Sequence, residues 1–160
     1  MDANRNAIML RPGEGESCPL WSPENTLTIK AAGDQTGGSL AAFEETIDPK
    51  VGPTMHIHRD SDELLYVLAG EFTFVVGDRK MTGPAGTCVF VPRGAAHAWM
   101  NAGTTPGRML FVFSPAGFER LLQEMSRRAE ILTDPIALNV LSSAHGTDYV
   151  GPPLAELDSA

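Results

Sequence analysis

The sequence predicts a single, mainly β domain: a small barrel of short strands followed by helices. Three observations predict it. The chain has 160 residues, which is enough for one continuous core and too few for two large ones. Short runs rich in Val, Ile, Leu, Phe and Thr extend from Leu27 to Phe113 and are separated by Gly, Pro or Asp. After Phe113 the apolar residues change to helical spacing.

The chain divides into three parts. Residues 1–25 mix Gly, Pro, Ser and Glu without a sustained apolar period, and we interpret them as an arm that Leu20 and Trp21 could hold against a surface. Residues 26–113 form the barrel. Residues 114–160 form a helical segment and a tail. The sequence has no internal repeat, so we expect one barrel and not a tandem pair.

The barrel strands follow from the period of two that alternating side chains give to a strand. Phe72, Phe74 and Val76 share one face of such a run, and Gly77-Asp78 supplies the turn after it. The expected strands are residues 26–31, 39–47, 54–58, 63–68, 71–76, 79–81, 88–91, 96–101 and 108–113.

Two helices are expected after the barrel. Ser114 and Pro115 offer an N-cap and a first-turn proline for the first helix. Its apolar positions are Phe118, Leu121, Leu122 and Met125. Thr133-Asp134-Pro135 starts a second, shorter helix that ends near His145-Gly146, and the chain from Gly151-Pro-Pro onward is expected to be loop.

The net charge of -8, from 12 basic and 20 acidic residues, argues against nucleic-acid binding because such a field repels phosphate. The N-terminus lacks the features of a signal peptide, and no apolar run reaches membrane-spanning length. We therefore expect a cytoplasmic protein that does not bind membranes. Cys18 and Cys88 are expected to be free thiols, with Cys88 a small core residue on a strand.

Three of the four histidines fall into two compact patterns. His56 and His58 are two apart on a predicted strand and so point to the same face, and Glu63 follows after a short polar turn. His97 follows a Pro-x-Gly turn further along the chain. Three imidazoles and a carboxylate on one face predict a site for one divalent ion such as Fe, Ni, Mn, Co or Zn.

Other polar residues near these patterns have simpler interpretations. Asp60 and Asp62 are expected to be solvated loop carboxylates. Asn101 is expected to make hydrogen bonds at a strand end. His145 is assigned to a helix end at the surface.

The two patterns resemble the paired motifs of the cupin superfamily. His56, His58, Glu63 and Gly70 match the first motif, and Gly86, Pro92, Gly94, His97 and Asn101 match the second. Gly52 departs from the usual spacing because it stands three residues ahead of the first histidine, where the family usually has five. The resemblance covers roughly residues 35 to 113 and implies a double-stranded β-helix, or jelly roll, with the metal in its central pocket.

Strand parity suggests which other side chains surround the metal. Leu65 and Val67 share a face with Glu63, and Trp99 shares one with His97. These three residues are candidates for an apolar substrate pocket. For Trp99 in particular, simple packing of the barrel interior is an equal alternative.

Among cupins, a small single-domain protein with three histidines and one glutamate resembles the quercetin 2,3-dioxygenase group. The resemblance implies a dioxygenase acting on an aromatic or enolisable molecule, with Glu63 as both a metal ligand and the catalytic base. A redox-neutral isomerase, lyase or dehydratase is the first alternative, and a non-catalytic cupin that binds a small molecule is the second.

Two expectations about partners complete the analysis. The arm of residues 1–25 resembles segments that pair with a neighbouring barrel in related cupins, which implies a homodimer. No cofactor besides the metal is indicated, because no glycine-rich phosphate loop stands at a strand-to-helix junction.

Overall fold

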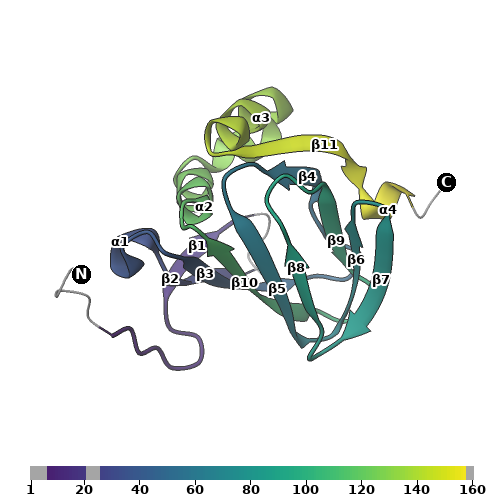
Figure 1. Ribbon diagram of the computed structural model, residues 1–160, viewed down its shortest axis with the longest axis horizontal. Helices are drawn as coiled ribbons and strands as arrows, with labels where there is room; N and C mark the ends of the chain where they lie inside the picture. The colour runs from purple at the N-terminus through teal and green to yellow at the C-terminus, as the bar shows by residue number, and fades with distance from the viewer. Residues whose placement is uncertain (1–6, 21–25, 158–160) are drawn as a thin grey trace.

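The computed structural model describes residues 7–20 and 26–157. Two antiparallel sheets face each other in a barrel, and the two longest helices lie at one end of it (Figure 1). This arrangement is the double-stranded β-helix, so the predicted fold class of a β-barrel with C-terminal helices is confirmed.

The larger sheet has the strand order β1-β2-β3-β10-β5-β8. These strands are β1 (Glu16–Pro19), β2 (Thr26–Ala31), β3 (Ala41–Ile47), β10 (Gly107–Ser114), β5 (Asp62–Ala69) and β8 (Cys88–Val91). Strand β10 pairs with both β3 and β5, so that Phe111 lies in register between Phe43 and Leu65. All three side chains are buried and form the middle of the barrel core.

The smaller sheet has the order β11-β4-β9-β6-β7. Its strands are β11 (Thr147–Pro153), β4 (Thr54–His58), β9 (His97–Asn101), β6 (Glu71–Val76) and β7 (Arg79–Pro84). Phe72 and Phe74 of β6 are buried in the core as their alternation predicts, and Gly77 makes the turn to β7 with a φ of 60°. Each strand predicted between residues 26 and 113 is present, with ends that shift by up to three residues.

Two strands were not predicted. Strand β1 lies within the expected arm and pairs with β2, which places the buried Cys18 opposite Leu27; Trp21 lies outside the described residues. Strand β11 (Thr147–Pro153) corrects the expectation of a loop at Gly151-Pro-Pro, because it pairs with β4 at the edge of the smaller sheet. An edge strand tolerates the prolines that made this segment resemble a loop.

The helices are α1 (Gly33–Thr36), α2 (Phe118–Arg127), the 3-10 helix η1 (Ala129–Thr133), α3 (Pro135–Ala144) and α4 (Leu154–Leu157). Helix α3 starts as predicted, since Asp134 accepts hydrogen bonds from the first backbone N–H groups. The start of α2 was predicted wrongly: Ser114 belongs to β10, and α2 begins only after Gly117. No helix in the described residues is long and apolar enough to cross a membrane.

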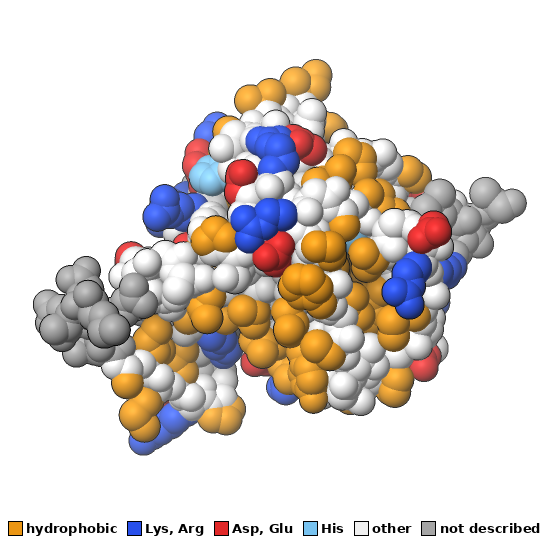
Figure 2. Space-filling view, viewed as in Figure 1, with side chains coloured by type: hydrophobic (Ala, Val, Ile, Leu, Met, Phe, Trp, Pro, Cys, Tyr) orange, Lys and Arg blue, Asp and Glu red, His pale blue; other side chains and the backbone are white. Residues whose placement is uncertain are grey.

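The outer face of the larger sheet is unusually apolar. Tyr66 on β5 and Phe90 on β8 are exposed, and Figure 2 shows hydrophobic side chains gathered over β5, β8 and β10. Cys18 and Cys88 are both free, as expected, but Cys88 is exposed on this outer face. The prediction that Cys88 lies in the core is therefore wrong. Side chains alternate along β8, and Val89 and Val91 are the ones that point inward.

Candidate metal centre

Three neighbouring strand segments bring the predicted metal ligands together. His56 and His58 are on β4, Glu63 is the second residue of β5, and His97 is the first residue of β9. His56 and His97 are paired directly across β4 and β9. All four predicted ligands therefore lie at the same end of the barrel interior.

An ion pair fixes the turns that carry two of these ligands. The Asp62 carboxylate accepts hydrogen bonds from the backbone N–H of Arg93, at 2.9 Å, and from its guanidinium, at 3.1 and 3.0 Å. Because Arg93 holds it in this way, the pKa of Asp62 falls to about 2. Asp62 thus joins the start of β5 to the turn before β9, which corrects its assignment as a merely solvated carboxylate.

The four side chains are almost completely buried. The ligand atoms of His56, His58, Glu63 and His97 all lie within 4.8 Å of one another. His58 Nε2, Glu63 Oε2 and His97 Nε2 are buried without a hydrogen-bond partner among the described residues. Buried polar atoms are almost always paired, so three unpaired atoms that converge on one point match the donor set of a bound cation.

The opposite nitrogens of the histidines are held by hydrogen bonds. His56 Nδ1 donates to the Thr54 carbonyl at 2.8 Å, and His97 Nδ1 donates to the Ala95 carbonyl at 3.0 Å. A carbonyl can only accept, so in these two rings Nδ1 carries a proton, and Nε2 is the atom available to bind a cation. His58 Nδ1 lies 3.1 Å from the Thr147 hydroxyl. Such outer contacts are what orients histidines that bind metals.

Burial controls the protonation of this group. Desolvation, with a contribution from the neighbouring imidazoles, lowers the pKa of His56 to about 3 and that of His58 to about 2. Burial also opposes a charge on His97, but the Glu63 carboxylate, 2.8 Å away, outweighs it and raises the pKa of His97. Two imidazoles are therefore neutral and ready to bind a cation near neutral pH.

The surroundings of the group are aromatic on one side. The Phe113 and Phe118 rings meet the His58 ring edge-on, with centroids at 5.0 and 4.8 Å. The two phenyl rings stack on each other at 4.3 Å. Phe113 lies on the predicted last barrel strand, whereas nothing in the sequence indicated that Phe118 of α2 would reach a predicted metal ligand.

The three candidate pocket residues lie deeper in the barrel. Leu65, Val67 and Trp99 are buried in the main core, and the Trp99 ring packs against Phe111 at 5.4 Å and Phe72 at 6.3 Å. None of the three lines the cavity that lies beside His58. Their role in binding substrate stays a prediction.

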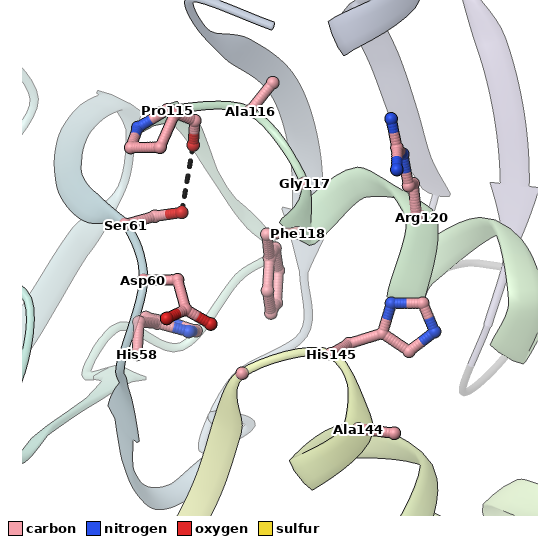
Figure 3. A pocket seen from close by; sticks show the side chains of 11 residues that line it. His58, Asp60, Ser61, Pro115, Ala116, Gly117, Phe118, Arg120, Ala144 and His145 are labelled. Carbon is pink, nitrogen blue, oxygen red and sulfur yellow. Dashed lines mark hydrogen bonds between the residues drawn. The ribbon is translucent and has the colours of Figure 1, made fainter.

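A cavity of about 260 Å³ lies beside the metal group. The turn after β4, the connection before α2 and the junction of α3 with β11 surround it (Figure 3). Its lining residues are His58, Asp60, Ser61, Pro115, Ala116, Gly117, Phe118, Arg120, Ala144, His145 and Gly146. His145, which was assigned to the surface, is half-buried in this wall and contacts Glu124 at 3.2 Å.

The motif residues outside the ligand set have structural roles. Asn101 is buried and, as predicted, makes hydrogen bonds at a strand end: its amide donates to the carbonyls of Ile47 and Thr105, and its oxygen accepts from the Gly103 N–H. A Cβ on Gly52 would lie 1.9 Å from the Trp99 carbonyl oxygen. The displaced glycine is therefore required by a close approach to β9.

Comparison with known proteins agrees with this geometry. Residues 43–113 match the family described as the Cupin domain, and this segment holds all four candidate ligands. Residues 43–113 form a cupin domain. No protein of curated function matches the sequence.

Solved structures share the cupin fold at low identity. KdgF from Halomonas sp. is 18% identical with a TM-score of 0.61, over 72% of this chain and 98% of that one. An RmlC-like cupin from Shewanella frigidimarina is 22% identical with a TM-score of 0.60, over 72% and 96%. A predicted oxalate decarboxylase from Thermotoga maritima is 21% identical with a TM-score of 0.55, over 57% and 80%. At these identities the likeness concerns the fold alone.

Proposed function

We propose that this cupin is a metal-dependent dioxygenase that acts on a small aromatic or enolisable molecule. The observation that carries the proposal is the buried group of three histidines and one glutamate, whose unpaired atoms converge on one point. The donor set suits a first-row divalent ion such as Fe, Ni, Mn, Co or Zn. His56, His58, Glu63 and His97 would hold it.

A bound ion would supply Lewis acidity, and a redox-active one would also supply affinity for oxygen. With four protein donors, such an ion would keep room to bind a substrate oxygen or water as well. The chain itself contributes the fixed Nε2 atoms, a pocket with little access for water, and the aromatic rings of Phe113 and Phe118 beside His58.

Glu63 has a second role in this proposal, as the base that takes a proton from the substrate. Its Oε2 lies 2.8 Å from His97 Nε2 and 3.5 Å from His58 Nε2, and it has no hydrogen-bond partner among the described residues. The role requires a carboxylate that is partly released from the metal, which can then accept the proton.

The experiment that tests the base is substitution Glu63→Gln in metal-loaded protein. We expect oxygen consumption with enolisable aromatic substrates to fall by about 10²-fold or more, in line with the usual contribution of a general base. Metal content measured on the same sample separates loss of the base from loss of the ion. A variant that keeps both its metal and full turnover would eliminate Glu63 as the base.

A redox-neutral reaction, an isomerisation, elimination or dehydration, is the second candidate. The cavity next to His58 favours it, because Asp60, Arg120 and His145 in its wall suit a polar substrate better than a flat apolar one. Turnover in the absence of oxygen decides between the two, since a dioxygenase requires oxygen in stoichiometric amount.

We also propose that two copies of this chain form a homodimer. The proposal is supported by the apolar outer face of β5, β8 and β10, and by the exposed side chains of Ile8, Met9 and Leu10 in the extended N-terminal segment (Figures 1 and 2). At a net charge of -8 two copies repel each other, and an uncharged apolar face is where they can meet with the least repulsion.

A further inference from the structure

The metal group is closed to solvent in this structure. The exposed fraction is 6% for His56, 4% for His58, 2% for Glu63 and 1% for His97. A substrate that binds an ion there must pass through the protein surface, so the chain needs an entrance that opens.

The cavity of about 260 Å³ is in the right place for this entrance. Its wall contains both His58, which belongs to the metal group, and Phe118. Figure 3 shows the Phe118 ring between His58 and Asp60 on one side and His145 on the other. A molecule in the cavity is therefore separated from the metal group by few side chains, and Phe118 is one of them.

Phe118 packs against aromatic rings on one side and borders the cavity on the other. Its ring stacks on Phe113 at 4.3 Å and meets the His58 ring at 4.8 Å. The residue is nevertheless only half-buried, because it borders the cavity. Because one side of the ring borders the cavity, the side chain has room to change rotamer in that direction.

The backbone before Phe118 has a conformation that requires glycine, and a buried glutamate anchors it. Phe118 is the first residue of α2, and Gly117 before it has a φ of 148°, which only glycine adopts readily. Glu119 is buried and accepts hydrogen bonds from the backbone N–H groups of Gly33, at 3.0 Å, and Gly117, at 2.7 Å. This anchor holds the start of α2 in place, so the Phe118 ring can move while the helix does not.

We propose that the cavity is the entrance to the metal centre and that Phe118 is its gate, which limits the size of the molecules that reach the ion. The inference rests on the proposed metal site but not on the reaction carried out there. It makes Phe118 a residue that determines specificity: a smaller side chain at this position admits bulkier molecules, and a larger one excludes them.

The test measures how fast a chelator reaches the metal. Protein loaded with one equivalent of zinc is mixed with an excess of the chromogenic chelator 4-(2-pyridylazo)resorcinol, and zinc transfer is followed by absorbance. We expect transfer to be about tenfold faster in Phe118→Ala than in the wild type, which corresponds to a modest change in an access barrier. The rate in the variant should also depend more steeply on chelator concentration.

Three further variants separate a gate from general loosening of the site. Phe118→Leu should give an intermediate rate, and Phe118→Trp should give a rate at or below that of the wild type, whereas simple destabilisation would accelerate both. Met81→Ala, which changes an exposed apolar residue on β7, should leave the rate unchanged. Zinc bound equally in all proteins with equal transfer rates would overturn the gate alone. Absence of bound zinc in the wild type, together with failure to bind Fe, Ni, Mn or Co, would overturn the gate and the proposed metal site together.

Discussion

At the scale of single residues, the metal centre depends on which nitrogen of each histidine is engaged elsewhere. The carbonyls of Thr54 and Ala95 hold the Nδ1 atoms of His56 and His97, so their Nε2 atoms face the ligand group. His58 depends instead on the Thr147 hydroxyl. The spacing of the histidines predicts the ligand set, but these supporting contacts come from backbone positions and from a distant strand.

A second buried carboxylate lies outside the metal centre. Glu45 on β3 shares the inward face with Phe43 and Ile47, and its register partners Leu27 and Met109 are apolar. Burial raises the pKa of Glu45 from 4.5 to about 8. The barrel therefore contains a carboxyl group that is protonated at neutral pH and that plays no part in the proposed reaction.

This burial predicts a pH dependence of stability. The folded state holds the Glu45 proton up to about pH 8, whereas the unfolded chain releases it near 4.5. The stabilising effect is complete below about pH 4.5 and is lost as the pH rises toward 8. We expect Glu45→Gln to be more stable than the wild type above pH 8, on the order of 1–3 kcal/mol.

Denaturant unfolding at pH 5 and pH 8.5 checks this prediction. The matched control is Glu44→Gln, the neighbour on β3 that faces outward and contacts Arg108 at 3.5 Å. The control should show no comparable gain at high pH. Equal pH profiles for wild type and Glu45→Gln would contradict the assignment of a buried proton.

At the scale of elements, β11 links the C-terminal segment to the metal centre. It pairs with β4 along the strand that carries two histidines, and Thr147 at its start is in register with His58. The strand thus covers the edge of β4 and supplies the partner of His58 Nδ1. The helices before it bring the chain back to this edge, and α2 contributes Phe118 on the way.

Removing the hydroxyl at the start of β11 should weaken the metal site. Thr147→Val keeps the β-branched shape but leaves His58 Nδ1 without its partner, and loss of such a contact typically costs about 10-fold or more in metal affinity. Competition with a chelator of known affinity measures the change. Thr28→Val on β2 is the control, since it changes a strand threonine far from the histidines; an equal effect in both variants would contradict the role of Thr147.

The strands also show which parts of the fold can be predicted from the sequence. The barrel strands could be predicted because each has a clear alternation and a turn residue at its end, as in β6 with Phe72, Phe74 and Gly77. Strand β11 could not be predicted, because Gly151 and the two prolines after it are typical of a loop. They are tolerated here because a strand at the edge of a sheet does not need every backbone N–H for pairing. The burial of Cys88 was predicted wrongly because neighbouring residues in a short apolar run give no sign of which alternate set faces inward.

At the scale of the whole molecule, the apolar outer face of the larger sheet predicts self-association. Phe90 is 60% exposed on β8, and Tyr66 lies near it on the neighbouring strand β5. We expect a dimer by light scattering at micromolar concentration. Phe90→Glu places a charge on this face and should shift the protein toward the monomer, because a dimer related by twofold symmetry buries two such charges together.

The control for this experiment is Ile136→Glu, an exposed apolar residue on α3 that is 79% exposed and away from the sheet. It should leave the dimer intact. A wild type that is monomeric at all concentrations tested would contradict the proposed homodimer, and a dimer unaffected by Phe90→Glu would contradict the proposed face.

The central claim is that His56, His58, Glu63 and His97 bind one metal ion, and elemental mass spectrometry of protein purified without a His tag or chelator tests it most directly. We predict one divalent transition-metal ion per chain in the wild type and its loss in His58→Ala. An absence of metal in the wild type, even after reconstitution with Fe, Ni, Mn, Co or Zn, would contradict the claim and remove the basis for the proposed enzyme.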